Sequence, residues 1–191
     1  VQIWKPKQKN TFETEWGFSC MGYEISGALG IKMAKPDQDV IVFVGDGSYL
    51  LHNSDIYSSV IYDKKLIIVV CDNGGHMVIN RLQLAKGGKE YLCNLRSANA
   101  SKLQFVDFEA HAKSMGANGE TVKSIADLES AFERAKKSDK TYVISIETHG
   151  YEWLEGSAFW ESPTLELPNT KENEDAIKEH LDGKDKQRKG V

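Results

Sequence analysis

Two unbroken runs of apolar residues stand out in the first half of the chain. Residues 40–44 read VIVFV, and residues 66–71 read LIIVVC. β-Branched and aromatic residues without polar interruption are typical of strands that are buried on both faces of a sheet. A third run of this kind lies at 142–146, and a shorter strand is expected at 120–123. We therefore predict a sheet whose core strands are covered on both sides.

Helical patterns fill the intervals between these strands. Small or apolar residues recur at nearly every turn of 23–30, and 49–62 shows helical spacing. Further helices are predicted at 108–113 and at 124–137, the second capped by Ser124. The alternation predicts an α/β fold, a doubly wound and mostly parallel sheet with helices on both faces.

The remaining segments have a different character. Residues 85–103 lack periodicity, and a long irregular loop is often a lid or a substrate loop. We predict one domain at 1–152, followed by a C-terminal arm and charged tail at 153–191. Two tryptophans and a phenylalanine in that arm are expected to pack on a neighbouring domain or subunit. The charges of 169–191 predict a solvated helix.

Polar loops follow both of the first two strands. Gly45-Asp46-Gly47-Ser48 comes after the first and Asp72-Asn73-Gly74-Gly75 after the second, with 27 positions from Asp46 to Asn73. That interval suits one helix and one return strand, so both loops should open at one edge of a parallel sheet. Asp46 and Asn73 would offer oxygen ligands to Mg²⁺, while backbone N–H groups at 47–48 donate to a diphosphate. Taken singly, each loop is also a common tight turn.

Composition narrows the class of protein. The 191 residues are 40% hydrophobic and 27% charged, with a net charge of −4, which indicates a soluble globular body and argues weakly against nucleic acid as a partner. No run has membrane length. Cys20, Cys71 and Cys93 form no paired motif, so we expect reduced thiols and a cytoplasmic protein. Because the chain starts at Val1, we expect a piece of a longer polypeptide or a processed form.

The two loops resemble the motif of thiamine-diphosphate (ThDP) enzymes, in which Gly-Asp-Gly-Ser is followed by an Asn-Asn pair. Here Asp72-Asn73 stands at that pair. The resemblance implies a domain that binds the diphosphate of ThDP through Gly45, Asp46, Gly47 and Ser48. It also implies Mg²⁺ ligation by Asp46, by Asn73 and by the backbone carbonyl of Gly75.

Residues 17–23 (GFSCMGY) resemble a Gly-x-Gly-x-Met-Gly stretch of acetolactate-synthase-like members, with Ser19 at the second glycine. By that resemblance, the Ser19 carbonyl accepts the 4′-amino group of ThDP, and Met21 is the apolar wedge that bends the cofactor. In pyruvate-decarboxylase-like members a catalytic glutamate occupies the position of Ile79, so that protonation chemistry is not expected here. No catalytic residue is assigned. His76 is the one titratable group expected beside the cofactor, and His52 is expected on a helix surface.

Four strings, at 18–24, 45–50, 80–83 and 148–152, resemble the subgroup that hydrolyses a carbon–carbon bond of trihydroxycyclohexane-1,2-dione in inositol catabolism. The implied substrate is a polyhydroxylated dione, with His76 and residues 85–103 and 149–151 as candidate contacts.

Two alternatives stay open: a carboligase or decarboxylase of 2-oxo acids, and a non-catalytic ThDP-fold domain. The resemblance also implies a pyrimidine-binding domain, in the same polypeptide or in a partner subunit of a homo-oligomer. Nothing in these residues resembles that domain, so the chain alone is expected to be inactive.

Overall fold

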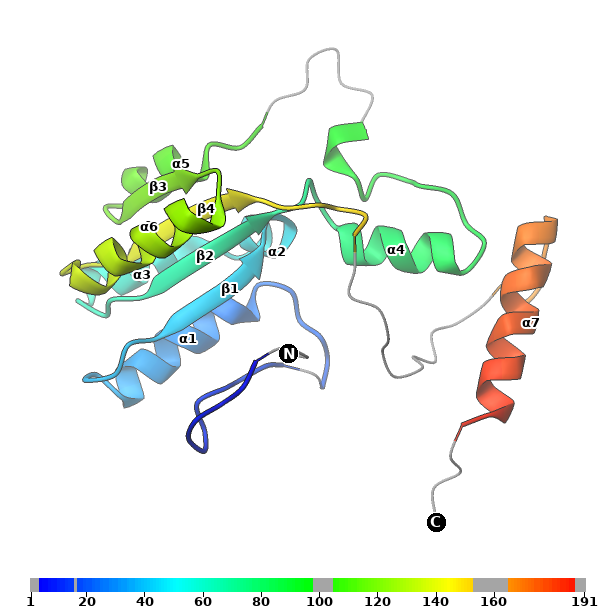
Figure 1. Ribbon diagram of the computed structural model, residues 1–191, viewed down its shortest axis with the longest axis horizontal. Helices are drawn as coiled ribbons and strands as arrows, with labels where there is room; N and C mark the ends of the chain where they lie inside the picture. The colour runs from blue at the N-terminus through cyan, green and yellow to red at the C-terminus, as the bar shows by residue number, and fades with distance from the viewer. Residues whose placement is uncertain (1–3, 16, 98–104, 153–164, 188–191) are drawn as a thin grey trace. The chain divides into compact units, whose positions relative to one another are not determined.

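The computed structural model describes residues 4–15, 17–97, 105–152 and 165–187 (Figure 1). The chain divides into two compact units. The first comprises Val1–Asp72 and Phe105–Glu147, and the second comprises Asn73–Gln104 and Thr148–Val191. The predicted aromatic arm at 153–164 lies outside the described residues.

The first unit is built on four parallel strands in the order β1-β2-β4-β3. The strands are β1 (Ile41–Gly45), β2 (Ile67–Asp72), β3 (Asn118–Val122) and β4 (Tyr142–Glu147). Because β1 and β2 are parallel neighbours, their carboxyl ends meet at the same edge of the sheet, with Gly45 in register with Cys71. The prediction that both polar loops leave one edge is confirmed up to these strand ends.

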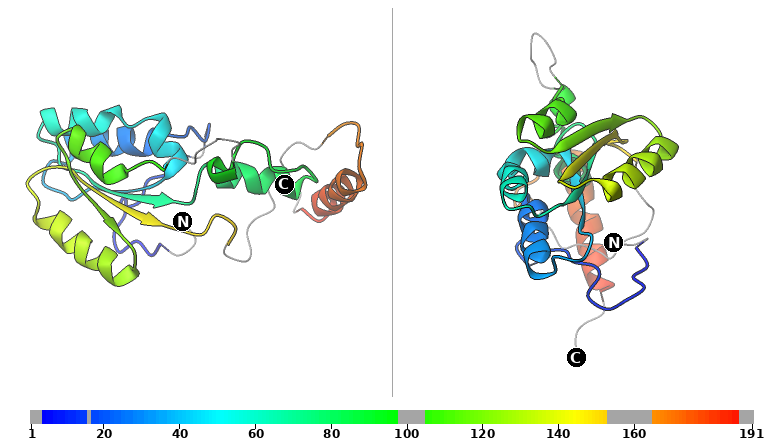
Figure 2. Two further views of the ribbon diagram at one scale, coloured as in Figure 1. Left: turned by 90° about the horizontal axis from the view of Figure 1, so that it is seen from above. Right: turned by 90° about the vertical axis from the view of Figure 1, so that its left-hand side faces the viewer.

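Helices cover both faces of this sheet, as predicted (Figure 2). One face carries α1 (Tyr23–Ala34), α3 (Ser54–Ile61) and α5 (Phe108–Ser114), and the other carries α6 (Ile125–Lys137). The alternating side chains of β2 divide between the two layers: Ile68 and Val70 face the first group, and Ile67 and Val69 face α6. The predicted cap is confirmed, because the Ser124 hydroxyl accepts from the N–H of Asp127.

Burial of β1 differs from the prediction. β2 is buried on both faces from Ile67 to Val70, but Ile41 and Phe43 of β1 are 38% and 60% exposed. Both side chains lie on the face that α6 covers for the neighbouring strands, and β1 is at the edge of the sheet. The prediction that residues 40–44 are covered on both faces is therefore wrong for this chain.

The helix after β1 also differs from the prediction. It begins at Asp46 itself and is divided into α2 (Asp46–Leu51) and α3 by His52 and Asn53. Asp46 is thus the first residue of a helix, where a continuous helix over 49–62 had been expected. The His52 side chain is half exposed and lies 3.6 Å from the Asp55 carboxylate, in agreement with a surface position.

The second unit contains α4 (Met77–Ala85), the short 3₁₀ helix η1 (Leu95–Ser97) and α7 (Lys171–Asp185). The sequence patterns did not predict α4. The charged tail does form a helix, and α7 is fastened at its first turn, where Asn173 Nδ2 donates to the carbonyl of Gly87 at 2.8 Å. No described helix is both long enough and apolar enough to cross a membrane.

Candidate functional site

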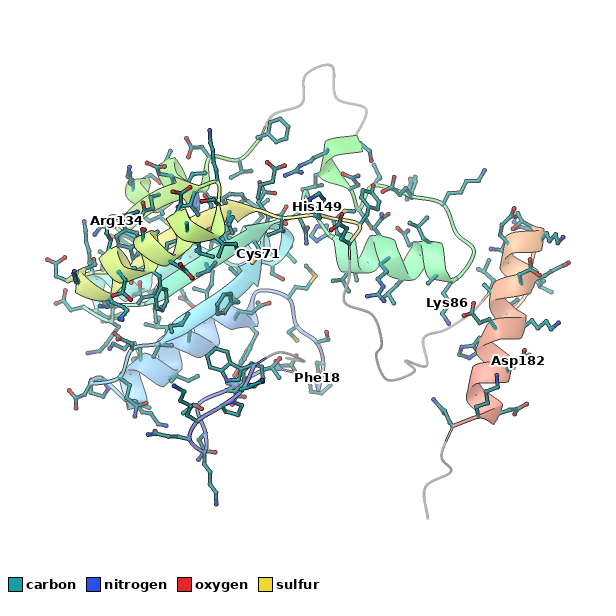
Figure 3. The ribbon with its side chains drawn as sticks, viewed as in Figure 1. Phe18, Cys71, Lys86, Arg134, His149 and Asp182 are labelled. Atoms are coloured by element: carbon teal, nitrogen blue, oxygen red, sulfur yellow. The ribbon has the colours of Figure 1, made fainter. Side chains whose placement is uncertain are left out.

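Asp46 lies at the carboxyl edge of the sheet. The register of β1 with β2 places it one residue beyond the Gly45–Cys71 pair, and its side chain is only 4% exposed. Burial raises the pKa of the Cys71 thiol, and the negative charge of Asp46 raises it further. Figure 3 shows Cys71 on β2. A buried carboxylate thus lies where the sheet ends, and carboxylate oxygens are ligands that a hard cation such as Mg²⁺ prefers.

Gly45 leaves room beside that carboxylate. A Cβ built on Gly45 would meet no atom of the described residues within 4 Å. The packing of this chain therefore does not require glycine there, whereas the close approach of a diphosphate would. Gly47 is buried and Ser48 half-buried in the first turn of α2. The predicted cradle at 45–48 fits a phosphate group.

The segment before α1 forms a turn that the Glu15 side chain stabilises. The Glu15 carboxylate accepts hydrogen bonds from the N–H groups of Phe18 and Cys20, each at 2.7 Å. These bonds lower the pKa of Glu15. Between them, Ser19 has a φ of 52°, in the left-handed region that favours glycine. At the other end, a Cβ on Gly22 would collide with the Cβ of His52.

This turn carries the two residues predicted to contact the cofactor rings. Ser19 is an exposed residue of the first unit. Met21 is 39% exposed, and Phe18 is 91% exposed (Figure 3). Apolar side chains left uncovered beside the turn are consistent with a surface that receives a ligand or another domain.

The predicted ligands Asn73 and Gly75 lie at the start of the second unit, directly after β2. Gly74 and Gly75 have φ values of 90° and 136°, a backbone conformation that residues with a side chain rarely adopt. Gly75 pairs with Asn94 in an isolated bridge, and a Cβ on Gly75 would collide with the carbonyl of Cys93. Glycine at 75 is therefore required by the backbone itself.

The candidate catalytic position carries no acid or base. Ile79, which the sequence resemblance matches to a catalytic glutamate of decarboxylases, lies on α4 and is 43% exposed. His76 precedes α4, and its Nδ1 is buried without a hydrogen-bond partner in the described structure. His149 is 80% exposed and lies 3.8 Å from Glu152. Of these groups, His76 is the one with an unsatisfied buried nitrogen.

The predicted ligands of Mg²⁺ are mixed donors, and the structure describes them in two separate units. Across the described ranges, no three or more His, Cys, Asp or Glu side chains gather where they could hold a metal. The predicted set is of another kind, one carboxylate, one amide and one backbone carbonyl, and Mg²⁺ commonly completes such a set with phosphate and water. Asp46 belongs to the first unit and the other two ligands to the second.

Among the polar contacts that were not predicted, two groups lie next to predicted site residues. One is the Glu15 carboxylate described above. The other joins Asn80, Glu90, Asn94 and Tyr151 in the second unit, where the Tyr151 hydroxyl donates to Glu90 Oε1 and the pKa of Glu90 is lowered. The sequence contained one weak signal for this group, because Asn80 and Tyr151 belong to the strings at 80–83 and 148–152.

Comparison with protein families matches residues 1–146 to the family described as thiamine pyrophosphate enzyme, C-terminal TPP binding domain. Thiamine pyrophosphate (TPP) is another name for ThDP. Among solved structures, a thiamine diphosphate-dependent 4-hydroxybenzoylformate decarboxylase of Rhodococcus jostii RHA1 has a TM-score of 0.56 and 24% identity, over 68% of this chain and 23% of that one. That likeness concerns the fold alone.

Several curated relatives bear the name 3D-(3,5/4)-trihydroxycyclohexane-1,2-dione hydrolase. The protein of Listeria innocua is 41% identical over 160 residues, which are 83% of this chain and 25% of the relative. That of Halalkalibacterium halodurans is 38% identical over 157 residues, 79% of this chain and 24% of the relative. The protein of Lacticaseibacillus casei is 36% identical over 191 residues, which are 97% of this chain and 29% of the relative. The chain thus spans only about a quarter of the length of these relatives.

Proposed function

The chain belongs to the thiamine pyrophosphate enzyme family, as its C-terminal TPP-binding domain. From this premise we propose that the chain is the cofactor-binding domain of an enzyme that hydrolyses a carbon–carbon bond. The proposed substrate is trihydroxycyclohexane-1,2-dione, a cyclic dione of inositol catabolism. The observation that carries the proposal is the similarity to relatives that bear this name, over 79% to 97% of the chain.

We propose that the chain holds the cofactor with three groups of residues. Gly45, Asp46, Gly47 and Ser48 take the diphosphate, and Asp46, Asn73 and the carbonyl of Gly75 take Mg²⁺. Ser19 and Met21 contact the rings. The low exposure of Asp46, the open space at Gly45 and the left-handed backbone at Ser19 and Gly75 support this assignment.

When bound, ThDP supplies an electron sink for breaking a bond next to a carbonyl. The protein's own residues have to orient the ring and satisfy its hydroxyl groups, because unpaired hydroxyls are costly to bury. We propose His76 for this task, because its imidazole directly follows Gly74 and Gly75 in the chain. The apolar Ile79 is consistent with a reaction that does not use a decarboxylase-type acid.

The proposal requires a second domain. ThDP enzymes of this kind bind the cofactor between a diphosphate-binding and a pyrimidine-binding domain, and the rest of the relatives' length can provide the second. We propose that it comes from the same polypeptide or from a partner subunit in a homo-oligomer, and that the protein acts in the cytoplasm. Domain limits at 1–152 and 153–191 are part of the same proposal.

The test is direct. The natural polypeptide that carries this chain is supplied with ThDP, Mg²⁺ and the cyclic dione, and the product is followed by NMR. Ring opening to a linear deoxy-uronic acid is expected. Formation of acetolactate from pyruvate, with the dione left intact, would instead identify a carboligase. Absence of ThDP binding would reject both in favour of a non-catalytic domain.

A further inference from the structure

Four polar side chains from three segments meet in the second unit, and we refer to Asn80, Glu90, Asn94 and Tyr151 as the bracing cluster. The Tyr151 hydroxyl and Asn80 Nδ2 both donate to Glu90 Oε1, the latter at 2.7 Å. Asn94 Nδ2 donates to the Tyr151 hydroxyl at 2.8 Å and lies 3.5 Å from Glu90 Oε1. One carboxylate oxygen therefore ties together α4, the loop after it and the segment after β4.

The cluster reaches the proposed metal loop through Asn94. The backbone of 93–95 runs along the loop: the N–H of His76 donates to the Cys93 carbonyl at 2.8 Å, and the N–H of Leu95 donates to the Gly74 carbonyl at 2.9 Å. Asn94 is the residue that bridges Gly75. Whatever fixes Asn94 therefore also fixes the peptide of Gly75.

A second connection runs through Tyr151. A Cβ on its neighbour Gly150 would lie 2.8 Å from the carbonyl of Asn73 and 3.0 Å from the Met77 side chain. The segment before Tyr151 is thus pressed against the backbone of Asn73, at a spacing that only glycine allows. The cluster consequently holds two segments that touch the two proposed metal ligands of this unit.

We propose that Glu90 and Tyr151 are positioning residues, which set the backbone of Asn73 and Gly75 for Mg²⁺ by anchoring the segments at 93–95 and 148–151. This inference rests on the proposed magnesium and ThDP site. Groups that orient metal ligands without touching the metal commonly change metal affinity 10- to 100-fold, about the effect expected here. The loss arises because the released loop samples conformations in which its oxygens do not converge.

Three variants test separately the contributions of the Tyr151 hydroxyl, of the Glu90 acceptor oxygen and of the Glu90 charge. Tyr151→Phe removes one hydroxyl group and keeps the ring, Glu90→Ala removes the shared acceptor, and Glu90→Gln keeps an oxygen acceptor without the charge. Tyr91→Phe is the matched control, since Tyr91 is next to Glu90, is 70% exposed and is not in the cluster. The measurement is the Mg²⁺ concentration that gives half-maximal ThDP binding, determined calorimetrically on the natural polypeptide.

Tyr151→Phe and Glu90→Ala are expected to raise that concentration by about 10-fold or more. Glu90→Gln should restore most of the affinity, and Tyr91→Phe should leave it unchanged. Saturating Mg²⁺ should return ThDP affinity to the unsubstituted value in every variant. A role in folding alone would not be rescued by Mg²⁺, and it would lower the unfolding temperature of the metal-free protein instead.

Normal Mg²⁺ dependence in Tyr151→Phe would overturn the inference. A raised KM for the dione with normal Mg²⁺ dependence would also overturn it, by assigning the cluster to the substrate. The proposed function fails in a distinguishable way: if the unsubstituted polypeptide binds ThDP and Mg²⁺ but does not open the dione, the substrate is wrong and the positioning test still stands. If it binds no ThDP with Mg²⁺, the site itself is wrong and the inference fails with it.

Discussion

Replacing Asp46 by asparagine tests the proposed metal site most sharply. The change removes one negative charge and alters the shape of the side chain very little. Asp46 is 4% exposed and is the only carboxylate in the proposed set of ligands. We expect Asp46→Asn to abolish Mg²⁺-dependent ThDP binding and to leave the fold intact, because burial of a neutral amide is less costly than burial of a charge.

The size of the effect follows from ligand linkage. With Mg²⁺ and ThDP at 10 times the dissociation constant, bound ligand stabilises the folded chain by about 1.4 kcal/mol. For the isolated chain of 191 residues, that corresponds to a rise of about 3 to 6 °C in the unfolding temperature, and the shift is smaller for the longer natural polypeptide. If Asp46→Asn weakens binding 100-fold, the same ligand concentration stabilises by less than about 0.1 kcal/mol. The thermal shift should therefore disappear.

The assay is thermal unfolding with and without ligand. Mg²⁺ alone and ThDP alone serve as blanks, and Asp72→Asn serves as the matched control. It makes the same chemical change at the end of the neighbouring strand, at a residue that is not among the proposed ligands, and it should keep the full shift. If Asp46→Asn keeps the shift and Asp72→Asn loses it, the carboxylate of Asp46 is not the metal ligand and the site has been misplaced.

Three further predictions concern the turn, the pH dependence and the sheet. Glu15→Ala should weaken ThDP binding about 10-fold in calorimetry without a measurable change in the unfolding free energy from denaturation curves, and Glu13→Ala should change neither quantity. Burial would raise the pKa of Glu120, but hydrogen bonds from Arg134 and Tyr142 lower it. The ionised carboxylate therefore stabilises the fold by about 0.5 kcal/mol at neutral pH, and this stabilisation is lost as the pH falls through the pKa of the folded state. Glu120→Gln should remove that pH dependence in denaturation curves. Ile68→Ala should cost about 2 to 5 kcal/mol of unfolding free energy and Phe43→Ala far less, unless a further segment covers β1.

The sequence predicted those features that depend on local periodicity and on parallel pairing. The run at 66–71 is apolar at every position and predicted a strand buried on both faces, which β2 is from Ile67 to Val70. Because a parallel strand must return through a crossover, the spacing of 27 positions was enough to bring the ends of β1 and β2 to one edge. The Asp46 half of the candidate site follows from that pairing.

The same patterns could not predict what depends on neighbours that are distant in sequence. Residues 40–44 are as apolar as 66–71, but β1 is at the edge of the sheet and α6 does not reach it, so Phe43 is exposed. The contact of Glu90 with Tyr151 spans 61 positions, and a single polar residue in an irregular loop gives no sign of its partner. Sequence strings indicated that Tyr151 mattered without indicating what it contacts.

Ser19 departs from the Gly-x-Gly-x-Met-Gly stretch that residues 17–23 resemble, and this turn gives a physical explanation. A residue with a side chain in the left-handed region costs about 1 to 2 kcal/mol, which is why glycine is usual there. The Glu15 carboxylate accepts the N–H groups on both sides of Ser19, so the turn keeps this conformation without glycine. Gly22 also has a positive φ, but a Cβ there would collide with His52. A side chain is therefore tolerated at position 19, where the positive φ is the constraint, whereas position 22 needs glycine both for its positive φ and because a Cβ would collide with His52.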